Sequence, residues 1–214
     1  MAEGVSVIIL AGGRSSRMGR DKVWMVLDGQ PLVERVVRRL LPLAAEILVS
    51  ATDSEAYGAL LRSLPVPGEV VADQYPGFGP LAGIQAGLSA ARSDLALVIA
   101  ADMPFVSTAL LQHLIWLAQG YDGVVPYIHD PRKMSGGLEP LHALYRRSCL
   151  PAIEKHLAAN DRQVLCFFDD VRIRTVPSEE IREFDPDLLS FFNVNTPEDW
   201  QEAQRMLGYA QTGQ

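Results

Sequence analysis

The chain has 214 residues, with 19 Lys and Arg against 26 Asp and Glu, which gives a formal net charge of −7 at pH 7. Hydrophobic residues make up 48% and charged residues 21% of the chain, so it can bury a sizeable core and is neither disordered, collagenous nor coiled-coil in composition. The acidic balance argues against a general nucleic-acid binder, because such proteins present a basic face to phosphates.

The cysteine pattern and the N-terminus indicate where the protein works. Cys149 and Cys166 form neither a CxxC pair nor a metal-type cluster with any of the histidines, which are His113, His129, His142 and His156. The N-terminal apolar run has no basic segment before it and ends at Gly12, and no window reaches the roughly 18 apolar residues of a membrane span. We therefore expect two reduced thiols, a cytoplasmic location and no contact with a membrane.

Short apolar runs of strand length recur at residues 5–10, 47–51, 70–71, 95–100 and 123–126. Between them, apolar residues recur at helical spacing, as in Leu32, Val36 and Leu40, and again in Leu81, Ile84 and Leu88. Unbroken apolar strands that alternate with amphipathic helices indicate a parallel sheet covered on both faces. The sequence predicts an α/β fold, a three-layer Rossmann-like arrangement with a mostly parallel central sheet, in a single domain over residues 1–214.

Several element boundaries have local causes. Pro31 and Pro80 each suit the first turn of a helix, and Ser107 with Thr108 can cap a third one. Residues 195–199 place a polar cap, a proline and two acids before a helix over 200–207. The polar, glycine-bearing stretch 129–139 is predicted to be a mobile loop.

The string LAGGRSSRMGRDK at residues 10–22 follows the first predicted strand. Its glycines let the backbone approach a ligand closely and point successive N–H groups at an anion. Four of the 19 basic residues lie within residues 14–22, and they are Arg14, Arg17, Arg20 and Lys22. This density predicts a phosphate site, in which Arg20 is the residue most easily explained as merely solvated. The string contains neither a Walker loop nor a GxGxxG fingerprint.

Asp102 follows the predicted strand 95–100, in the turn Asp102-Met103-Pro104. A carboxylate at the end of a buried central strand is costly unless it is paired or bound to a cation. Facing the basic glycine loop, it could hold Mg²⁺ on a nucleoside triphosphate. Taken alone, an Asp-x-Pro turn is more often structural.

The stretch from Asp73 to Ile84 is rich in glycine and proline and leads into a predicted helix. Backbone donors at that helix N-terminus can reach a base or a ribose. Asp73 could accept a hydrogen bond from a ligand, or could simply cap the turn.

Four strings together resemble the molybdenum cofactor guanylyltransferases. They are LAGG…RMG.DK at 10–22, GPLAGI at 79–84, Asp102-x-Pro104, and NVNTPE at 193–198, and they span nearly the whole chain in the family's order. The first and third strings occur more widely in nucleotidyltransferases of sugar phosphates and terpenoid precursors. Gly12-Gly13, GPLAG and NVNTP narrow the resemblance to the guanylyltransferases.

The resemblance implies a nucleotidyltransferase fold and the transfer of GMP from GTP to the terminal phosphate of molybdopterin carrying molybdenum, with release of pyrophosphate. It implies Mg²⁺ as cofactor, bound by Asp102, and catalytic roles for Lys22, Arg17 and Asp102. The implied GTP contacts are Leu10, Ala11, Gly12, Gly13, Lys22, Ser50, Asp73, Gly79, Pro80, Leu81 and Asp102. Family members often carry Asn where Ser50 stands, and serine has a shorter reach and no amide.

The acceptor contacts and protein partners rest on the same resemblance. Arg132 and Lys133 are expected to meet the pterin phosphate. Asn193 and Asn195 could help hold metal or acceptor, or one of them could only cap the last helix. The partners implied besides GTP and molybdopterin are transient ones, namely molybdenum-insertion proteins and molybdoenzyme chaperones.

Two alternatives remain open at this point. One is a related nucleotidyltransferase, acting either on the same pterin with CTP or on a sugar phosphate. The other is a non-catalytic nucleotide or pterin carrier that has kept the fold. The presence of both Lys22 and Asp102 speaks against a carrier, which needs no charge stabilisation at a breaking bond.

Overall fold

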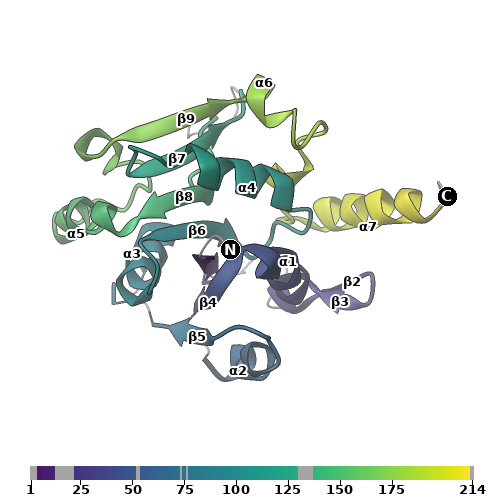
Figure 1. The fold of residues 1–214 in the computed structure, drawn as a ribbon. Helices are drawn as coiled ribbons and strands as arrows, with labels where there is room; N and C mark the ends of the chain where they lie inside the picture. The colour runs from purple at the N-terminus through teal and green to yellow at the C-terminus, as the bar shows by residue number, and fades with distance from the viewer. Residues whose placement is uncertain are drawn as a thin grey trace.

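A computed structural model describes residues 4–12, 22–51, 54–72, 74–75, 77–129 and 137–212. Within these ranges, a central sheet of seven strands has the order β5-β4-β1-β6-β8-β7-β9 (Figure 1). The strands are β1 (Val5–Leu10), β4 (Ala44–Ser50), β5 (Gly68–Val71), β6 (Leu95–Ala100), β7 (Gly123–Tyr127), β8 (His142–Arg146) and β9 (Ile173–Pro177). A separate two-stranded antiparallel ribbon joins β2 (Val26–Leu27) and β3 (Gln30–Pro31).

The predicted mostly parallel sheet is confirmed. β1 pairs in parallel with β4 and β6, β4 with β5, and β7 with β9. The exception is β8, which runs antiparallel to both β6 and β7. The sequence did not predict β8 and β9, because neither is an unbroken apolar run: a histidine opens β8 and an arginine interrupts β9.

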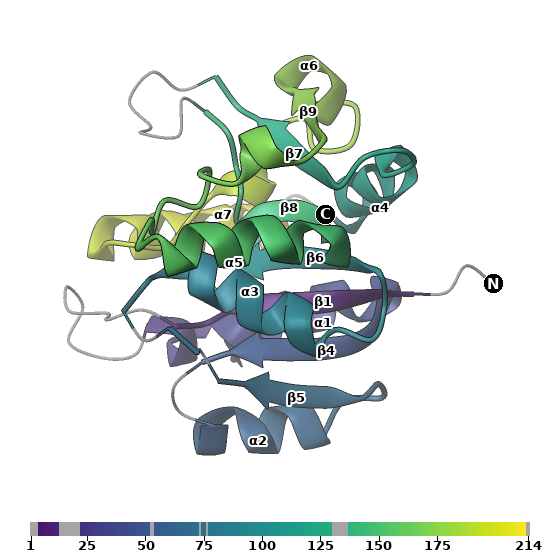
Figure 2. The ribbon, with the colours of Figure 1, turned by 90° about the vertical axis from the view of Figure 1, so that its left-hand side faces the viewer.

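Helices cover both faces of the sheet. They are α1 (Leu32–Leu40), α2 (Ser54–Arg62), α3 (Pro80–Ala90), α4 (Thr108–Leu117), α5 (Leu150–Ala158), α6 (Ser178–Ile181) and α7 (Pro197–Thr212). Short 3-10 turns are η1 (Lys22–Trp24), η2 (Leu41–Leu43), η3 (Arg147–Cys149), η4 (Phe168–Asp170) and η5 (Leu189–Phe191). α3 and α5 lie on one face, toward the viewer in Figure 2, and α1 and α4 lie on the other (Figure 1).

The alternation of β1 shows why five of its six residues are apolar, with Ser6 as the exception. Val7 and Ile9 pack in the cluster that includes α1 and α4, whereas Ile8 packs in the cluster that includes α3 and α5. Successive side chains of a strand point to opposite faces, so a strand covered on both sides has no polar face. This confirms the three-layer arrangement.

Helix starts follow the predicted signals with small shifts. Pro80 opens α3, and the Ser107 hydroxyl accepts a 3.3 Å hydrogen bond from the Leu110 amide at the start of α4. The last helix is longer than predicted and begins at Pro197. Its cap is a reciprocal pair, in which Thr196 Oγ1 accepts from the Asp199 amide at 3.1 Å and Asp199 Oδ2 accepts from the Thr196 amide at 2.8 Å.

Glycines at 83 and 87 let α3 lie directly on the sheet. A Cβ at Gly87 would stand 2.6 Å from Cγ2 and 2.8 Å from Cδ1 of Ile8, which is fully buried. Contacts that short require the helix or the strand to move. The sequence of α3 therefore fixes its distance from β1.

We expect Gly87→Ala to destabilise the protein. Overpacking costs about 1–3 kcal/mol, and the better helix propensity of alanine offsets at most about 1 kcal/mol of this. Urea unfolding should show a net loss of about 1 kcal/mol or more. Gly58→Ala in α2 is the matched control, because its Cβ would meet only the guanidinium end of Arg62, at 3.1 Å. Equal effects of the two substitutions would contradict the packing argument.

Candidate active site

The carboxyl ends of three adjacent strands meet at one edge of the sheet. Leu10 is in register with Ser50 of β4 and with Ala100 of β6. The pairing continues one residue further, because the Ala11 amide donates to the Ser50 carbonyl at 3.0 Å and the Ala101 amide donates to the Leu10 carbonyl at 3.0 Å. In open α/β sheets, ligands bind outside this edge.

The N-terminus of α3 lies against the same edge. A Cβ at Gly83 would stand 2.8 Å from Ser50 Oγ and 2.9 Å from Leu10 Cδ2, so glycine lets the first turn of α3 come this close without displacing either side chain. Gly79, the N-cap residue of α3, has φ 73°, a left-handed conformation that favours glycine. The free N–H groups of this first turn form a partly positive end, which suits a phosphate or a polar ligand group.

The predicted nucleotide contacts divide into exposed and buried groups. Gly12, Gly79 and Pro80 are exposed, and Leu10 and Ala11 are half-buried, so all five border open space near the strand ends. The side chains of Ser50 and Leu81 are buried, and that of Ser50 packs against Gly83. The GTP contacts of these residues stay predictions.

Lys22, Asp102 and Asn195 come together from three distant parts of the chain. Lys22 opens η1, Asp102 follows β6, and Asn195 precedes α7. Lys22 Nζ donates to Asp102 Oδ2 at 2.6 Å and to Asn195 Oδ1 at 2.8 Å. The Val194 amide donates to the Asp102 carbonyl at 3.0 Å, which holds the two segments in register. The sequence predicted that Asp102 faces the basic loop, and the Lys22–Asp102 contact agrees with this.

Asp102 has one oxygen left over. Its side chain is 16% exposed, and Oδ1 is buried without a hydrogen-bond partner among the residues that the structure describes. A buried carboxylate oxygen without a partner carries a desolvation cost, which a cation would relieve. Oδ1 is thus the atom of the site best suited to bind a metal ion.

The structure gives less information on the other predicted site residues. Asn193 is half-buried, two residues before Asn195. Neither residue provides the side-chain cap of α7, since Thr196 and Asp199 do so. The remaining predicted residues lie outside the described ranges, and their roles stay predictions: Gly13, Arg14, Arg17, Arg20, Asp73, Arg132 and Lys133.

Sequence reasoning missed a buried histidine next to this edge of the sheet. His142 opens β8, pairs with Ile99 of β6, and has its ring 4.8 Å from that of Phe191. Neither ring nitrogen has a hydrogen-bond partner within the described part of the chain. Burial lowers the pKa of His142 from 6.5 to about 3, so the ring is neutral at physiological pH. A single histidine among apolar residues does not indicate from the sequence that its ring is buried without a hydrogen-bond partner.

The chain matches the model of the MobA-like NTP transferase domain over residues 7–172. A protein of Chloroflexus aggregans named probable molybdenum cofactor guanylyltransferase is 39% identical over 210 residues, which cover 95% of this chain and 95% of that protein. The molybdenum cofactor guanylyltransferase of Desulfosudis oleivorans is 33% identical over 207 residues, with 94% and 95% covered.

Solved structures agree with these matches. The molybdopterin-guanine dinucleotide biosynthesis protein A of Archaeoglobus fulgidus superposes with a TM-score of 0.79 at 30% identity, covering 95% of this chain and 99% of that one. The 2-C-methyl-D-erythritol 4-phosphate cytidylyltransferase of Thermus thermophilus, at 21% identity and a TM-score of 0.66, shares the fold.

Fold and relatives together define the class as nucleotidyltransferase. Within that class, the chain belongs to the MobA-like NTP transferase family and, in it, to the molybdenum cofactor guanylyltransferases. The resemblance drawn from the four sequence strings is thereby confirmed. None of the helices in the described ranges is long and apolar enough to cross a membrane.

The buried histidine predicts how stability depends on pH. The folded-state pKa of His142, about 3, lies below its unfolded value, so the unfolded chain binds a proton that the folded chain does not. The stability linked to this neutral ring is fully present above pH 6.5 and is lost as the pH falls toward 3. Urea unfolding at a series of pH values should show a shallower acid decline for His142→Phe than for the unmodified protein. Equal declines would contradict the burial of a neutral ring.

Proposed function

We propose that the protein transfers the GMP moiety of GTP to the terminal phosphate of molybdopterin carrying molybdenum, with release of pyrophosphate. The observation that carries the proposal is the Lys22–Asp102–Asn195 cluster at the carboxyl ends of β1 and β6, in a chain of this family. A cation donor, an incompletely paired carboxylate and a helix N-terminus at one edge suit a triphosphate.

The reaction asks little covalent chemistry of the protein. An oxygen of the acceptor phosphate attacks the α-phosphorus of GTP, and the bond from that phosphorus to the bridging oxygen of the β-phosphate breaks. The acceptor phosphate is already ionised near neutral pH, so no strong general base is needed. The tasks left to the chain are in-line positioning and neutralisation of the charge that develops on pyrophosphate.

Lys22 is the described residue best suited to neutralise that charge. Its ammonium group is held by two oxygen acceptors, Asp102 Oδ2 and Asn195 Oδ1, and its side chain is 19% exposed. It is therefore fixed in position before a substrate arrives, and fixed donors need little reorganisation at the moment of reaction. We assign Arg17 to the same role and Asn195 to the orientation of Lys22.

Asp102 fits a magnesium ion. Mg²⁺ commonly takes one or two protein carboxylates together with substrate phosphate oxygens and water, and Asp102 Oδ1 offers such a carboxylate oxygen. When bound, the ion would supply positive charge to the phosphate oxygens of GTP. Because Oδ2 is paired with Lys22, Asp102 would hold the ion and the ammonium group side by side.

The nucleoside and the acceptor would lie on either side of this cluster. We assign the GTP side to the backbone of residues 10–13 and 79–81, with Asp73 near the nucleoside. We assign the acceptor side to Asn193 and Asn195 and to the basic residues Arg132 and Lys133. The exposure of Gly12 and Gly79 at the strand ends supports the first assignment.

The role of Asp102 can be tested with Asp102→Asn, which keeps the shape of the side chain but removes its charge. Turnover, measured as Mg²⁺-dependent pyrophosphate release, should fall on the order of 10²-fold or more. Asp187→Ala, at an exposed position, is the control and should leave turnover unchanged. Wild-type turnover in the Asp102 variant would remove the carboxylate from the mechanism.

The role of Lys22 is separable from simple substrate binding. If its charge acts mainly on the departing pyrophosphate, Lys22→Gln should lower kcat by about 10²-fold while KM for GTP changes much less. Arg38→Gln, at an exposed site on α1 where Arg38 pairs with Glu34, is the control for loss of one positive charge. A rise in KM with an unchanged kcat would instead make Lys22 a ground-state binding residue.

A further inference from the structure

A second cluster of metal-binding residue types lies where α5 ends. His156 is in the last turn of α5, and Asp161 and Cys166 follow in the segment that leads to η4. One ligand atom from each residue lies within 4.8 Å of the other two, and all three residues are half-buried. The sequence predicted no such cluster, because the spacing of cysteines and histidines alone does not include Asp161.

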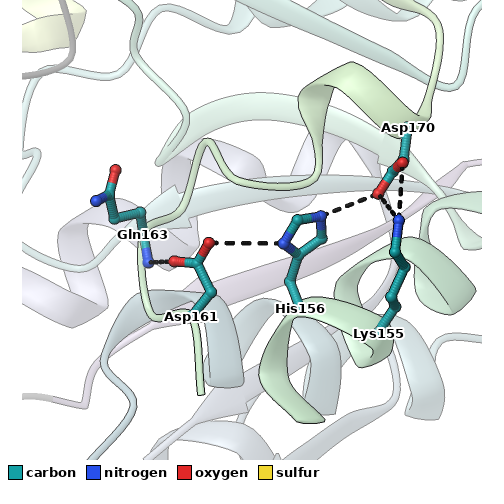
Figure 3. Close-up of polar contacts among 5 residues, drawn as sticks. All are labelled: Lys155, His156, Asp161, Gln163 and Asp170. Atoms are coloured by element: carbon teal, nitrogen blue, oxygen red, sulfur yellow. Dashed lines mark hydrogen bonds and ion pairs between the residues drawn. The ribbon is translucent and has the colours of Figure 1, made fainter. Parts of the chain in front are cut away.

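Contacts around His156 determine which ring nitrogen is available (Figure 3). Nε2 lies 2.9 Å from Asp170 Oδ2, and because a carboxylate only accepts, Nε2 must carry the hydrogen. Nδ1 faces Asp161 Oδ2 at 3.6 Å, which is too long for a hydrogen bond. In the neutral ring, the Nδ1 lone pair therefore points toward a carboxylate, an arrangement that a cation between them would stabilise.

The carboxylates of Asp161 and Asp170, on either side of His156, are each held in place by a hydrogen bond from another residue. Asp161 Oδ1 accepts a 3.1 Å hydrogen bond from the backbone N–H of Gln163, which leaves Oδ2 directed at His156. Asp170 accepts from Lys155 Nζ at 2.9 Å and 3.1 Å, on the side of His156 away from Asp161 (Figure 3). A carboxylate that orients a histidine through its second nitrogen is a recurrent support of zinc sites.

The spacing of the ligand atoms suits a tetrahedral ion. Zinc bonds of about 2.0–2.3 Å at tetrahedral angles place two ligand atoms roughly 3.3–3.8 Å apart. The His156–Asp161 pair already has 3.6 Å, and no pair exceeds 4.8 Å. Imidazole, carboxylate and thiolate together favour a borderline ion such as Zn²⁺ over Mg²⁺, which prefers oxygen ligands alone.

We propose that His156 Nδ1, Asp161 Oδ2 and Cys166 Sγ bind one Zn²⁺ ion, with Asp170 positioning His156 and water completing the tetrahedron. None of the three ligands belongs to the Lys22–Asp102–Asn195 cluster, so the proposal does not rest on the proposed function. The thiol of Cys166 must give up its proton to bind the ion, since thiolate is the metal ligand.

The position of the site suggests what it does. Arg162, next to Asp161, lies with its guanidinium carbon 4.5 Å from the ring centroid of Phe78 and donates to the Gly77 carbonyl at 3.5 Å. Phe78 and Gly77 precede Gly79, the N-cap residue of α3. A bound ion would fasten the 156–166 segment and, through Arg162, support the turn that leads into the nucleotide edge of the sheet.

Cobalt provides a direct test, because a thiolate ligand gives Co²⁺ an absorption that oxygen ligands cannot. Titration of the reduced, metal-free protein with Co²⁺ should produce a thiolate-to-cobalt charge-transfer band that saturates at one ion per chain and is displaced by Zn²⁺. Cys166→Ser should abolish the band. Asp161→Asn should weaken binding, and Asp170→Asn should weaken it about 10–100-fold, as expected for a residue that acts through His156.

Two controls separate this site from others. Cys149→Ser should keep the band, because the Cys149 thiol is buried and donates a hydrogen bond to the Asp122 carbonyl at 3.3 Å. Asp102→Asn should also keep it, which separates the result from any metal bound with the nucleotide. The absence of a charge-transfer band, or a band that survives Cys166→Ser, would overturn the proposal.

Discussion

The parallel pairing of β1 between β4 and β6 is the constraint on which the proposed active site depends. It brings the ends of three strands to one edge, and the two hydrogen bonds of Ala11 and Ala101 extend the pairing into the loops that follow. Gly83 then lets α3 approach Leu10 and Ser50 at the same edge. Strand register and a missing Cβ thus determine where the backbone donors lie.

The ion pair of Lys22 and Asp102 converts this edge into a charged site. The carboxylate keeps one oxygen for Lys22 and one without a described partner, while Asn195 holds the ammonium group from a segment 173 residues further along the chain. A chain with a net charge of −7 therefore keeps a positioned cation at the place where a triphosphate would carry its negative charge. Local placement, and not total charge, decides which ligand such a site attracts.

Elements with a simple local cause could be predicted from the sequence. The bounds of β1 and β6 are those of their apolar runs, and Pro80 opens α3. Such strands and helix starts are determined by residues that are neighbours in the sequence, so they can be predicted from it. β9 was missed because only one of its five residues, Val176, is buried, so it carries no apolar run. β8 was missed because its burial comes from distant elements that its own residues do not reveal. The positions of distant elements also hid His142 and the grouping of His156, Asp161 and Cys166, which depends on how the chain turns after α5. The caps at Thr196 and Asp199 show a finer limit: a polar stretch identified the helix start, but only the geometry identified which side chains cap it.

The most direct measurement of the central claim is the identity of the nucleotide transferred to the pterin. The protein would be incubated with molybdenum-loaded molybdopterin, Mg²⁺ and either GTP or CTP, and the product analysed by mass spectrometry alongside pyrophosphate release. With GTP, we expect a guanine dinucleotide of the pterin and one pyrophosphate per product, and with CTP we expect far slower turnover. A cytosine dinucleotide as the main product, or binding of GTP without any transfer, would contradict it.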